Sequence, residues 1–411
     1  MAAPFRHPPQ HRLIALNRDR MKTDRPIEPD KARARDADGG RWETLDPVSR
    51  GRVQILQVGN AHEQATALPA ELDRLKELSP GFQWSDCAVL ARTREELMPV
   101  RAALEACGIP VNQALDRDRF PPLHRLREVA DWLGFLKARR HELQKGSDLL
   151  AALEATIPEE NRWWQLVREL MEEWREASDD AEMPVSAAVE FLYESLSQRQ
   201  REAVPGNGIF LSTIHSAKGL EFRHLLILGG GWRHSADAPG REEERRLCYV
   251  AMTRARETLA LFERRDSRHP HLEVLREEAL VRRPALFSEL SFETTSLRHD
   301  LLSLEEIYLD FAGRQPASRG IHQRLSDLKP GTPLTLAPTQ AGHLEFFDAA
   351  SGPVARLSSK AREIWMPRLR GIVGIKVVAV IRRSLKDVTP EYAEALPCET
   401  WEVPVMEIQW R

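Results

Sequence analysis

The chain of 411 residues predicts an α/β fold, in which a parallel sheet with a helical insertion is followed by a small β-rich C-terminal domain. Short apolar runs alternate with amphipathic helical patterns over residues 48–115 and again over 205–265, which is typical of a parallel sheet with crossover helices. Between these segments, residues 116–204 show helical patterns. Residues 301–411 contain several short strand patterns separated by Gly, Pro, Asp and Ser.

The first sheet segment follows residues 1–47, which are rich in Pro, Arg and Asp and predict an irregular lead-in. We expect strands and helices in alternation, at 52–58 (strand), 62–78 (helix), 86–91 (strand), 95–107 (helix) and 109–111 (strand). Gly108 stands where a helix C-cap favours glycine.

The segment 116–204 breaks this alternation and predicts a helical insertion. Its helices are expected at 123–140, 149–156, 161–177 and 185–200. The tryptophans Trp163, Trp164 and Trp174 lie near three arginines (Arg162, Arg168 and Arg175), a combination compatible with base stacking beside phosphate contacts. An ordinary helix core with a charged outer face is the interpretation we favour.

The second sheet segment predicts two buried parallel strands, at 209–211 and 225–228, with a polar turn between them. Such strands end at loops that often carry chemistry. Beyond them we expect an amphipathic helix over 241–257 and a further strand over 258–263.

Residues 266–300 are charged and poorly periodic, so we expect a connector. After it, Ser303 is expected to cap a short helix, with Glu306 as its capping-box partner. The strand patterns lie at 333–336, 343–347, 353–357, 375–381 and 400–409, and they suggest a small barrel or sandwich.

This C-terminal region also contains a group of basic residues, which is a modest argument for nucleic-acid binding; a solvated basic face is the alternative. The group comprises Arg368, Arg370, Lys376, Arg382, Arg383 and Lys386. We find no acidic cluster followed by Glu-x-Lys that would indicate a nuclease.

The composition limits the possible classes of function. A net charge of −3 creates no overall cationic field, so any nucleic-acid binding must depend on local patches. The four cysteines are far apart and fit neither a metal site nor a disulfide framework. Because the chain shows no secretory h-region and no apolar run approaching eighteen residues, we expect a cytoplasmic protein without a membrane span.

Two motifs carry the functional signal: Ser212–Phe222 (STIHSAKGLEF) and Glu242–Glu257 (EEERRLCYVAMTRARE). They resemble motifs V and VI of the UvrD/Rep/PcrA group of superfamily 1 DNA helicases. Residues 86–93 (DCAVLART) are similar to the strand that opens the motif-IV region of the same domain. The resemblance implies a RecA-like second helicase lobe, discontinuous over 48–115 and 205–265, with 116–204 as a reduced form of the insertion called 2B.

In that family, two RecA-like lobes hold ATP between them. By matching positions, Arg254 would be the arginine finger at the γ-phosphate, a role that suits a planar and permanently charged group. Gly219 would approach the phosphates, where a side chain would collide, and Glu221 would hydrogen-bond the ribose. A solvated helix arginine is the alternative for Arg254, and Arg245 and Arg246 are expected to pair with the acidic residues Glu242–Glu244.

The resemblance also assigns a DNA-binding group. Thr213 and His215 would face single-stranded DNA and contact its phosphates, which positions the strand without reading its sequence. Arg92 is a further candidate for DNA contact, although a structural role is as well supported by the sequence. No metal ligands are predicted in this chain.

The phosphate-binding half of an ATP site is not found in the sequence. No G-x-x-x-x-G-K-[ST] pattern occurs in the 411 residues, and no Asp-Glu-x-Gln-type strand end precedes residue 86. The resemblance implies ATP and Mg²⁺ as cofactors, and we expect the Mg²⁺ to be held by a first lobe in trans or in a longer parent chain. Whether this chain alone is an enzyme stays open.

Two hypotheses of function follow from the sequence. In the first, the chain is the C-terminal part of an ATP-dependent 3′–5′ DNA helicase with a role in DNA repair. In the second, it is a non-catalytic module that binds DNA or docks on a repair assembly. A remnant without activity is a third possibility. The tail is similar to the end of bacterial proteins that join a RecQ-type helicase to a UvrD-type module.

Overall fold

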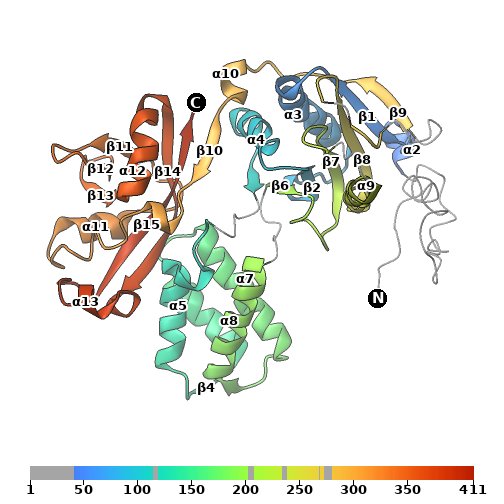
Figure 1. Cartoon of the computed structure of the whole chain (residues 1–411). Helices are drawn as coiled ribbons and strands as arrows, with labels where there is room; N and C mark the ends of the chain where they lie inside the picture. The colour runs from blue at the N-terminus through green and yellow to red at the C-terminus, as the bar shows by residue number, and fades with distance from the viewer. Residues whose placement is uncertain (1–40, 114–118, 202–207, 234–237, 268, 273–279) are drawn as a thin grey trace. The chain divides into compact units, whose positions relative to one another are not determined.

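The computed structural model describes residues 41–113, 119–201, 208–233, 238–267, 269–272 and 280–411. Residues 1–40 of the predicted lead-in, the ends of the predicted insertion and part of the predicted connector lie outside these ranges. The chain divides into two compact units (Figure 1). Unit 1 comprises 1–114 and 203–297, and unit 2 comprises 115–202 and 298–411.

Unit 1 is built on a parallel sheet, to which the described residues contribute seven strands in the order β3-β6-β2-β7-β8-β1-β9. Every pair of neighbouring strands in this sheet is parallel. The strands are β1 (Val53–Val58), β2 (Cys87–Ala91), β3 (Val111–Gln113), β6 (Ile209–Thr213), β7 (Phe222–Ile227), β8 (Ala255–Arg264) and β9 (Leu280–Pro284).

Both faces of this sheet are covered, because successive side chains of a strand point to opposite faces. Val89 and Ala91 of β2 belong to one core with helices α3 (Ala61–Leu78) and α4 (Leu97–Ala106). Ala88 and Leu90 of the same strand belong to another core with α9 (Ala238–Met252). Short helical segments complete the unit, namely α2 (Trp42–Leu45), η2 (Trp84–Asp86) and α10 (Phe292–Thr295). The doubly covered parallel sheet confirms the α/β class predicted for this part of the chain.

Helix α9 ends earlier than the sequence pattern predicts. The expected helix ran to Glu257, but the chain turns after Met252 and β8 begins at Ala255. The pairing of β8 with β7 and β1 overrides the helical propensity of this stretch. Arg254 therefore lies in the turn between helix and strand rather than on a helix face.

The predicted connector contains a strand of the sheet. β9 pairs in parallel with β1 at the sheet edge, although its sequence Leu-Val-Arg-Arg-Pro is strongly charged. Arg282 donates to Glu263 of β8, and Arg283 donates to Gln54 of β1 and pairs with Glu71 of α3. These cross-element bonds satisfy the charges, so an edge strand forms where hydrophobic periodicity alone indicates none.

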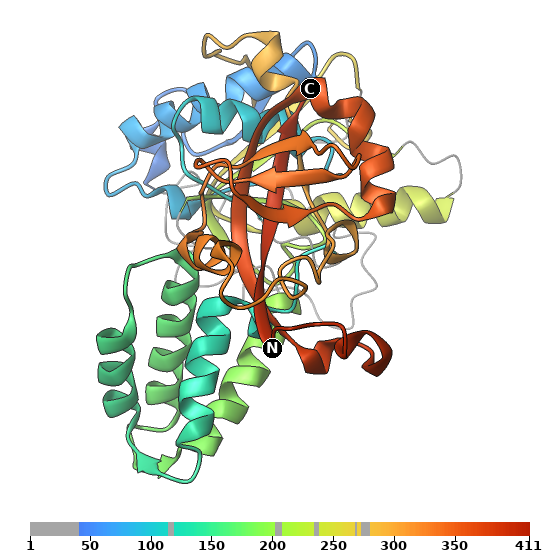
Figure 2. The same cartoon turned by 90° about the vertical axis from the view of Figure 1, so that its left-hand side faces the viewer.

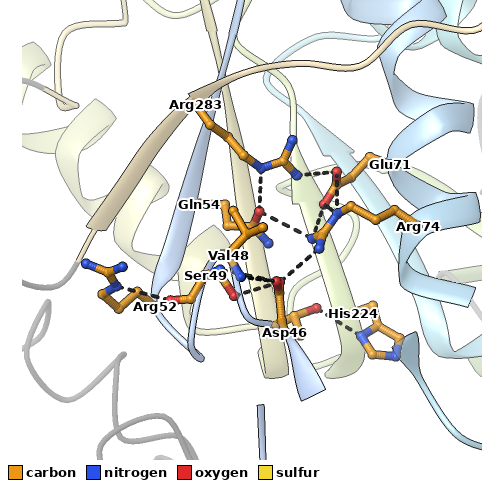
Figure 3. Close-up of polar contacts among 10 residues, drawn as sticks. Asp46, Val48, Ser49, Arg52, Gln54, Glu71, Arg74, His224 and Arg283 are labelled. Atoms are coloured by element: carbon orange, nitrogen blue, oxygen red, sulfur yellow. Dashed lines mark hydrogen bonds and ion pairs between the residues drawn. The ribbon is translucent and has the colours of Figure 1, made fainter. Parts of the chain in front are cut away.

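A buried polar network ties this edge to the start of unit 1 (Figure 3). Arg74 of α3 donates to Asp46 at 2.9 Å, to Glu71 at 2.7 Å and to Gln54 at 3.3 Å. Asp46 also accepts from the hydroxyl of Ser49 at 2.7 Å. Burial alone would raise the pKa of Asp46, but its bonds to Ser49 and Arg74 lower it below the ordinary value. The segment before β1 is therefore an ordered part of the lobe, and Trp42 lies in its core.

Unit 2 contains a helical segment and a β-rich segment. The helices form a small bundle (Figure 2), consisting of η3 (Leu123–Arg125), α5 (Arg127–Ala138), α6 (Gly146–Thr156), α7 (Arg162–Ala177) and α8 (Val185–Arg201). Asn161 caps α7 by accepting from the backbone N–H of Trp163 and Trp164. A short antiparallel pair, β4 (Leu143–Gln144) with β5 (Met183–Pro184), links two of the loops.

The β-rich segment forms two antiparallel sheets of three strands each among the described residues, in the orders β10-β15-β14 and β11-β12-β13. The strands are β10 (Arg298–Leu301), β11 (Thr335–Pro338), β12 (Leu344–Phe347), β13 (Pro353–Arg356), β14 (Ile372–Ser384) and β15 (Thr400–Trp410). The helical segments are η5 (Leu304–Glu306), α11 (Gly320–Asp327), α12 (Ser359–Trp365), η6 (Met366–Gly371), η7 (Leu385–Asp387) and α13 (Pro390–Ala393). The predicted capping box of Ser303 and Glu306 is confirmed.

The helical and β-rich segments share one hydrophobic core rather than forming two. Trp163, Trp164 and Trp174 are buried in it, which confirms the interpretation of these residues as helix core. The indole of Trp163 donates to the carbonyl of Val378 in β14 at 3.0 Å. Arg127 of α5 donates to the carbonyl of Leu328 at 2.7 Å. Unit 2 is therefore a single packed body.

In the part of the chain that the structure describes, no helix has both the length and the apolar content needed to cross a membrane.

We predict that His224 makes unit 1 sensitive to acid. His224 of β7 is fully buried and packs against Trp42 and Phe82. Its two ring nitrogens lie within hydrogen-bond distance of the hydroxyl groups of Thr258 and Ser79. Burial lowers the pKa of His224 from 6.5 to about 4. Between these values the unfolded chain binds a proton that the folded chain does not, so stability falls as the pH drops, by up to about 3 kcal/mol.

The measurement is the urea midpoint of the Trp fluorescence transition between pH 7.5 and 4.5, in the wild type and in His224→Gln. The variant should lose less stability than the wild type over this range. His215→Gln, which changes an exposed residue, serves as the matched control and should follow the wild type. Parallel pH profiles for His224→Gln and the wild type would contradict the assignment.

Candidate functional site

The two sequence motifs meet at the amino-terminal edge of the parallel sheet. Phe222 and Ala255, the first residues of β7 and β8, are paired at this edge. The backbone N–H of Phe222 donates to the carbonyl of Arg254 at 2.8 Å. The Arg254 guanidinium donates to the carbonyl of Leu220 at 3.2 Å and to that of Val250 at 3.1 Å. The structure thus brings Arg254 beside the segment that contains Gly219 and Glu221.

Gly219 and Glu221 occupy the turn that enters β7. Gly219 has φ = 91°, a backbone conformation that strongly favours glycine, while the space around an added Cβ would be open. The backbone conformation is thus one reason for glycine here, and the predicted approach to a phosphate stays a prediction. Glu221 is exposed and has one weak ionic contact, in which its carboxylate lies 4.0 Å from the Arg256 guanidinium.

The segment from Thr213 to Glu221 runs between the two edges of the sheet. Thr213 ends β6 at the carboxyl-terminal edge, where it pairs with Ala91, the last residue of β2. Ile214 and Ala217 are buried in the core beneath α9, which anchors the segment to the sheet. A single anchored segment therefore joins the predicted DNA-binding residues to the predicted nucleotide-binding residues.

Thr213 and His215 lie at the carboxyl-terminal edge. The Thr213 hydroxyl is 3.1 Å from the hydroxyl of Ser216, and the carbonyl of Thr213 accepts from the N–H groups of Ser216 and Ala217. Thr213 is half-buried, whereas His215 is exposed. His215 is therefore the more accessible residue of this pair.

Arg92 lies at the same edge but is already occupied by an internal partner. Its guanidinium makes hydrogen bonds of 2.7, 3.0 and 3.1 Å to the carboxylate of Glu244 in α9. The exposed fractions of the two side chains are 13% and 5%. Burial would raise the pKa of Glu244, but the bonds from Arg92 lower it below its ordinary value. The pair joins the end of β2 to α9, and DNA contact by Arg92 stays a prediction.

The acidic start of motif VI forms local ion pairs, as expected. Glu242 accepts from Arg245 at 2.6 Å and from Arg246 at 3.1 Å. The hydrogen bonds from Arg245 are the largest influence that lowers the pKa of Glu242 to about 2. The predicted pairing of Arg245 and Arg246 is confirmed, while the third acidic residue, Glu244, faces Arg92 instead.

The glycine loop after β7 is a feature of the carboxyl-terminal edge that the sequence left without a role. A Cβ at Gly229 would lie 2.5 Å from the carbonyl oxygen of Phe262, so only glycine fits beside β8. The Gly229 N–H donates to the side chain of Gln64 at 2.8 Å. Farther along this edge, Arg264 of β8 donates to Glu96 at 2.6 Å. The three glycines in a row were the signal of this close packing.

Comparison with known proteins supports the resemblance that the two motifs indicate. Residues 126–265 match the model of the UvrD-like helicase C-terminal domain, which covers the helices α5–α8 and both motifs. The chain carries a UvrD/PcrA-like superfamily 1 helicase C-terminal portion. The matched residues do not include 50–125.

Two curated relatives illustrate the likeness of this UvrD-like portion. The ATP-dependent DNA helicase PcrA of Staphylococcus epidermidis is 39% identical over 100 residues, and that of Staphylococcus aureus is 37% identical over 102 residues. The matched segments cover 22% and 23% of this chain. They span 14% of the length of each relative, so the chain matches a small part of these helicases.

A solved structure, the C-terminal domain of a possible DNA helicase from Lactobacillus plantarum, covers 56% of this chain and 84% of its own length. Its sequence is 13% identical, and the TM-score of 0.28 is too low to carry an argument about the fold.

We predict that Arg92 stabilises the UvrD-like lobe through Glu244. Arg92→Met should lower the free energy of unfolding by about 2–3 kcal/mol, because a buried carboxylate loses the hydrogen bonds from its guanidinium partner. The double variant Arg92→Met/Glu244→Met should recover at least about 1 kcal/mol of this loss. Urea denaturation provides the measurement in a double-mutant cycle.

Arg246→Met is the matched control, since Arg246 also pairs with a glutamate of α9 but is 75% exposed. We expect a change below about 0.5 kcal/mol there. If Arg92→Met were as stable as this control, the structural role of the pair would be wrong.

Proposed function

We propose that this UvrD-like lobe completes the ATP site of a 3′–5′ DNA helicase whose phosphate-binding lobe lies on another chain or on another part of a longer one. The observation that carries the proposal is the meeting of the two motifs at one sheet edge. Arg254, Gly219 and Glu221 lie within one turn-to-strand junction, held by the bonds of Arg254 to Leu220 and Phe222. This is an arrangement suited to contact one nucleotide from a single side.

The chemistry assigned to this face is electrostatic. A permanently charged guanidinium stabilises the charge that develops on a transferring phosphoryl group. In this structure the Arg254 guanidinium bonds to backbone carbonyls of its own lobe. As a finger it would exchange these bonds for phosphate oxygens, so its engagement would depend on the arrival of the first lobe with ATP.

The residues of this chain fit only one half of such a site. Over the described ranges no group of three or more His, Cys, Asp or Glu side chains is placed to hold a metal ion. In this proposal the Mg²⁺ of ATP would be held by the first lobe. Bound ATP·Mg²⁺ would supply the phosphoryl group for hydrolysis, while this lobe would supply the ribose contact, the close backbone approach and the charge.

The segment 213–221 supports a proposal about coupling. Thr213 and His215, at the opposite edge, would contact the phosphates of single-stranded DNA. Because Ile214 and Ala217 anchor the intervening segment in the core, a displacement at one end would be transmitted to the other. DNA binding and ATP hydrolysis would then depend on each other, as a translocating motor requires. A role in DNA repair and a cytoplasmic location belong to the same proposal.

The central test is DNA-stimulated ATP hydrolysis after a first lobe has been added, either as a separate protein or by fusion. Arg254→Ala should lower kcat by roughly 10³-fold or more, because the transition-state charge loses its finger. Arg254→Lys should recover only part of this rate, since lysine lacks the planar fork. Hydrolysis of ATP by the mixed lobes, followed by phosphate release, is the measurement.

Arg246→Ala provides the control, because Arg246 pairs with Glu242 on an exposed helix face. This variant should keep at least about half of the rate, as expected for an exposed ion pair. A reconstituted ATPase that is indifferent to Arg254→Ala would refute the assignment.

A further inference from the structure

The basic group of the C-terminal region divides into two sets in the structure. Lys376, Arg382 and Arg383 each pair with a carboxylate inside unit 2. Their partners are Glu407, Asp131 and Asp310, respectively. These three residues therefore have carboxylate partners within unit 2.

Arg368 and Arg370 differ from that set. Both belong to η6, directly before β14, and both are exposed. The ion pairs among the described residues of unit 2 include neither of them, nor Lys386 at the far end of β14. The cations of β14 pair with carboxylates, whereas Arg368 and Arg370, in the segment before this strand, mark a distinct surface.

An aromatic platform holds Arg368 in place. Its guanidinium lies 4.6 Å from the ring centroid of Trp410 and 5.7 Å from that of Trp365. The two indoles are themselves packed edge to face at 6.0 Å, and Trp410 is fixed by a 2.7 Å hydrogen bond from its N–H to Asp300. A guanidinium held over aromatic rings keeps its planar N–H edges available for an oxyanion at little further cost in conformational entropy.

The surroundings of this platform combine positive charge with exposed apolar side chains. Helix α12, which lies next to β14 in Figure 1, and the following η6 contain four cations and a single acid, Glu363. The cations are Lys360, Arg362, Arg368 and Arg370. The exposed apolar residues are Ile364 at 40%, Met366 at 38% and Val373 at 53%. We call residues 360–373 together with Trp410 the Arg368 surface.

We propose that the Arg368 surface binds single-stranded nucleic acid. Its cations match the phosphate backbone, and its exposed apolar side chains with the stacked guanidinium match base faces, which only an unpaired strand presents. A duplex would offer phosphates without base faces. The proposal goes beyond the function of the second lobe, because it places a strand contact on unit 2 that needs neither ATP nor the first lobe.

The test measures binding of a fluorescein-labelled oligothymidylate of about 20 nucleotides to the full chain, by anisotropy at several salt concentrations without nucleotide. Arg368→Ala/Arg370→Ala should raise Kd about tenfold. It should also reduce the slope of log K against log salt by about 1.4, since each lost phosphate contact on a single strand contributes about 0.7. Arg368→Lys should restore the slope but only part of the affinity.

Lys386→Ala is the matched control. Lys386 is exposed and belongs to the same basic group, but β14 separates it from the Arg368 surface by about 40 Å at a rise of about 3.3 Å per residue. It should leave Kd and salt slope unchanged. Equal thermal midpoints of the variants and the wild type would show that folding is intact.

Unchanged oligonucleotide affinity in Arg368→Ala/Arg370→Ala would overturn the proposal, as would an equal loss in Lys386→Ala. A variant that keeps oligonucleotide affinity but loses binding to polyglutamate would identify an acidic protein partner instead, which also overturns it. Failure here would leave the ATP-site proposal standing, because Arg254 and its ATPase test belong to unit 1 and do not involve these residues.

Discussion

The position of β2 between β6 and β7 is the constraint on which the candidate site depends. β6 and β7 follow each other in sequence and run in the same direction, but each pairs with β2 rather than with the other. The chain must therefore return from one sheet edge to the other over the residues between Thr213 and Phe222. Because of this crossing, the motif residues lie at both edges of the sheet. Ile214 and Ala217 are buried in the core and hold the crossing segment against the sheet.

Charged side chains then hold the surrounding elements to this frame. Arg92 joins the end of β2 to α9, and Arg264 joins the end of β8 to Glu96 before α4. At the start of the unit, Arg74 and Asp46 tie the segment before β1 to α3. Each of these pairs is at least partly buried. Removal of one partner would therefore destabilise the fold strongly, because the other charge would stay buried without a partner, whereas replacement of both partners by apolar residues would cost little. These pairs therefore specify which elements pack together, more than they add to the overall stability.

In unit 2, a shared apolar core holds the helical and β-rich segments together. The contact between Trp163 and β14 makes the helical segment and the C-terminal sheets one body. Any motion of the helical segment therefore involves the β-rich segment too. The Arg368 surface lies on this body, and a strand bound there would be carried with it.

The local structure of this chain was largely determined by its sequence. The helices α5–α8 were predicted within a few residues, since Asn161 is a strong N-cap and the apolar spacing is regular. Gly108, with φ = 69°, ends α4 where the sequence predicted a cap. The two motifs indicated the UvrD-like portion, and the family model matches the residues that contain them.

Only the tertiary structure decided the long-range partners. The charged strand β9 was missed because its stability comes from Glu71 and Glu263, which are distant in sequence. Likewise, nothing near Arg92 indicates Glu244, 152 positions away. Periodicity and caps record interactions within a few residues, whereas strand order and ion pairing depend on which distant surfaces the fold brings together. The sequence therefore determined most of the elements and the two motifs, because these depend on neighbouring residues. The fold determined which charged side chains pair with each other, because those partners are distant in sequence.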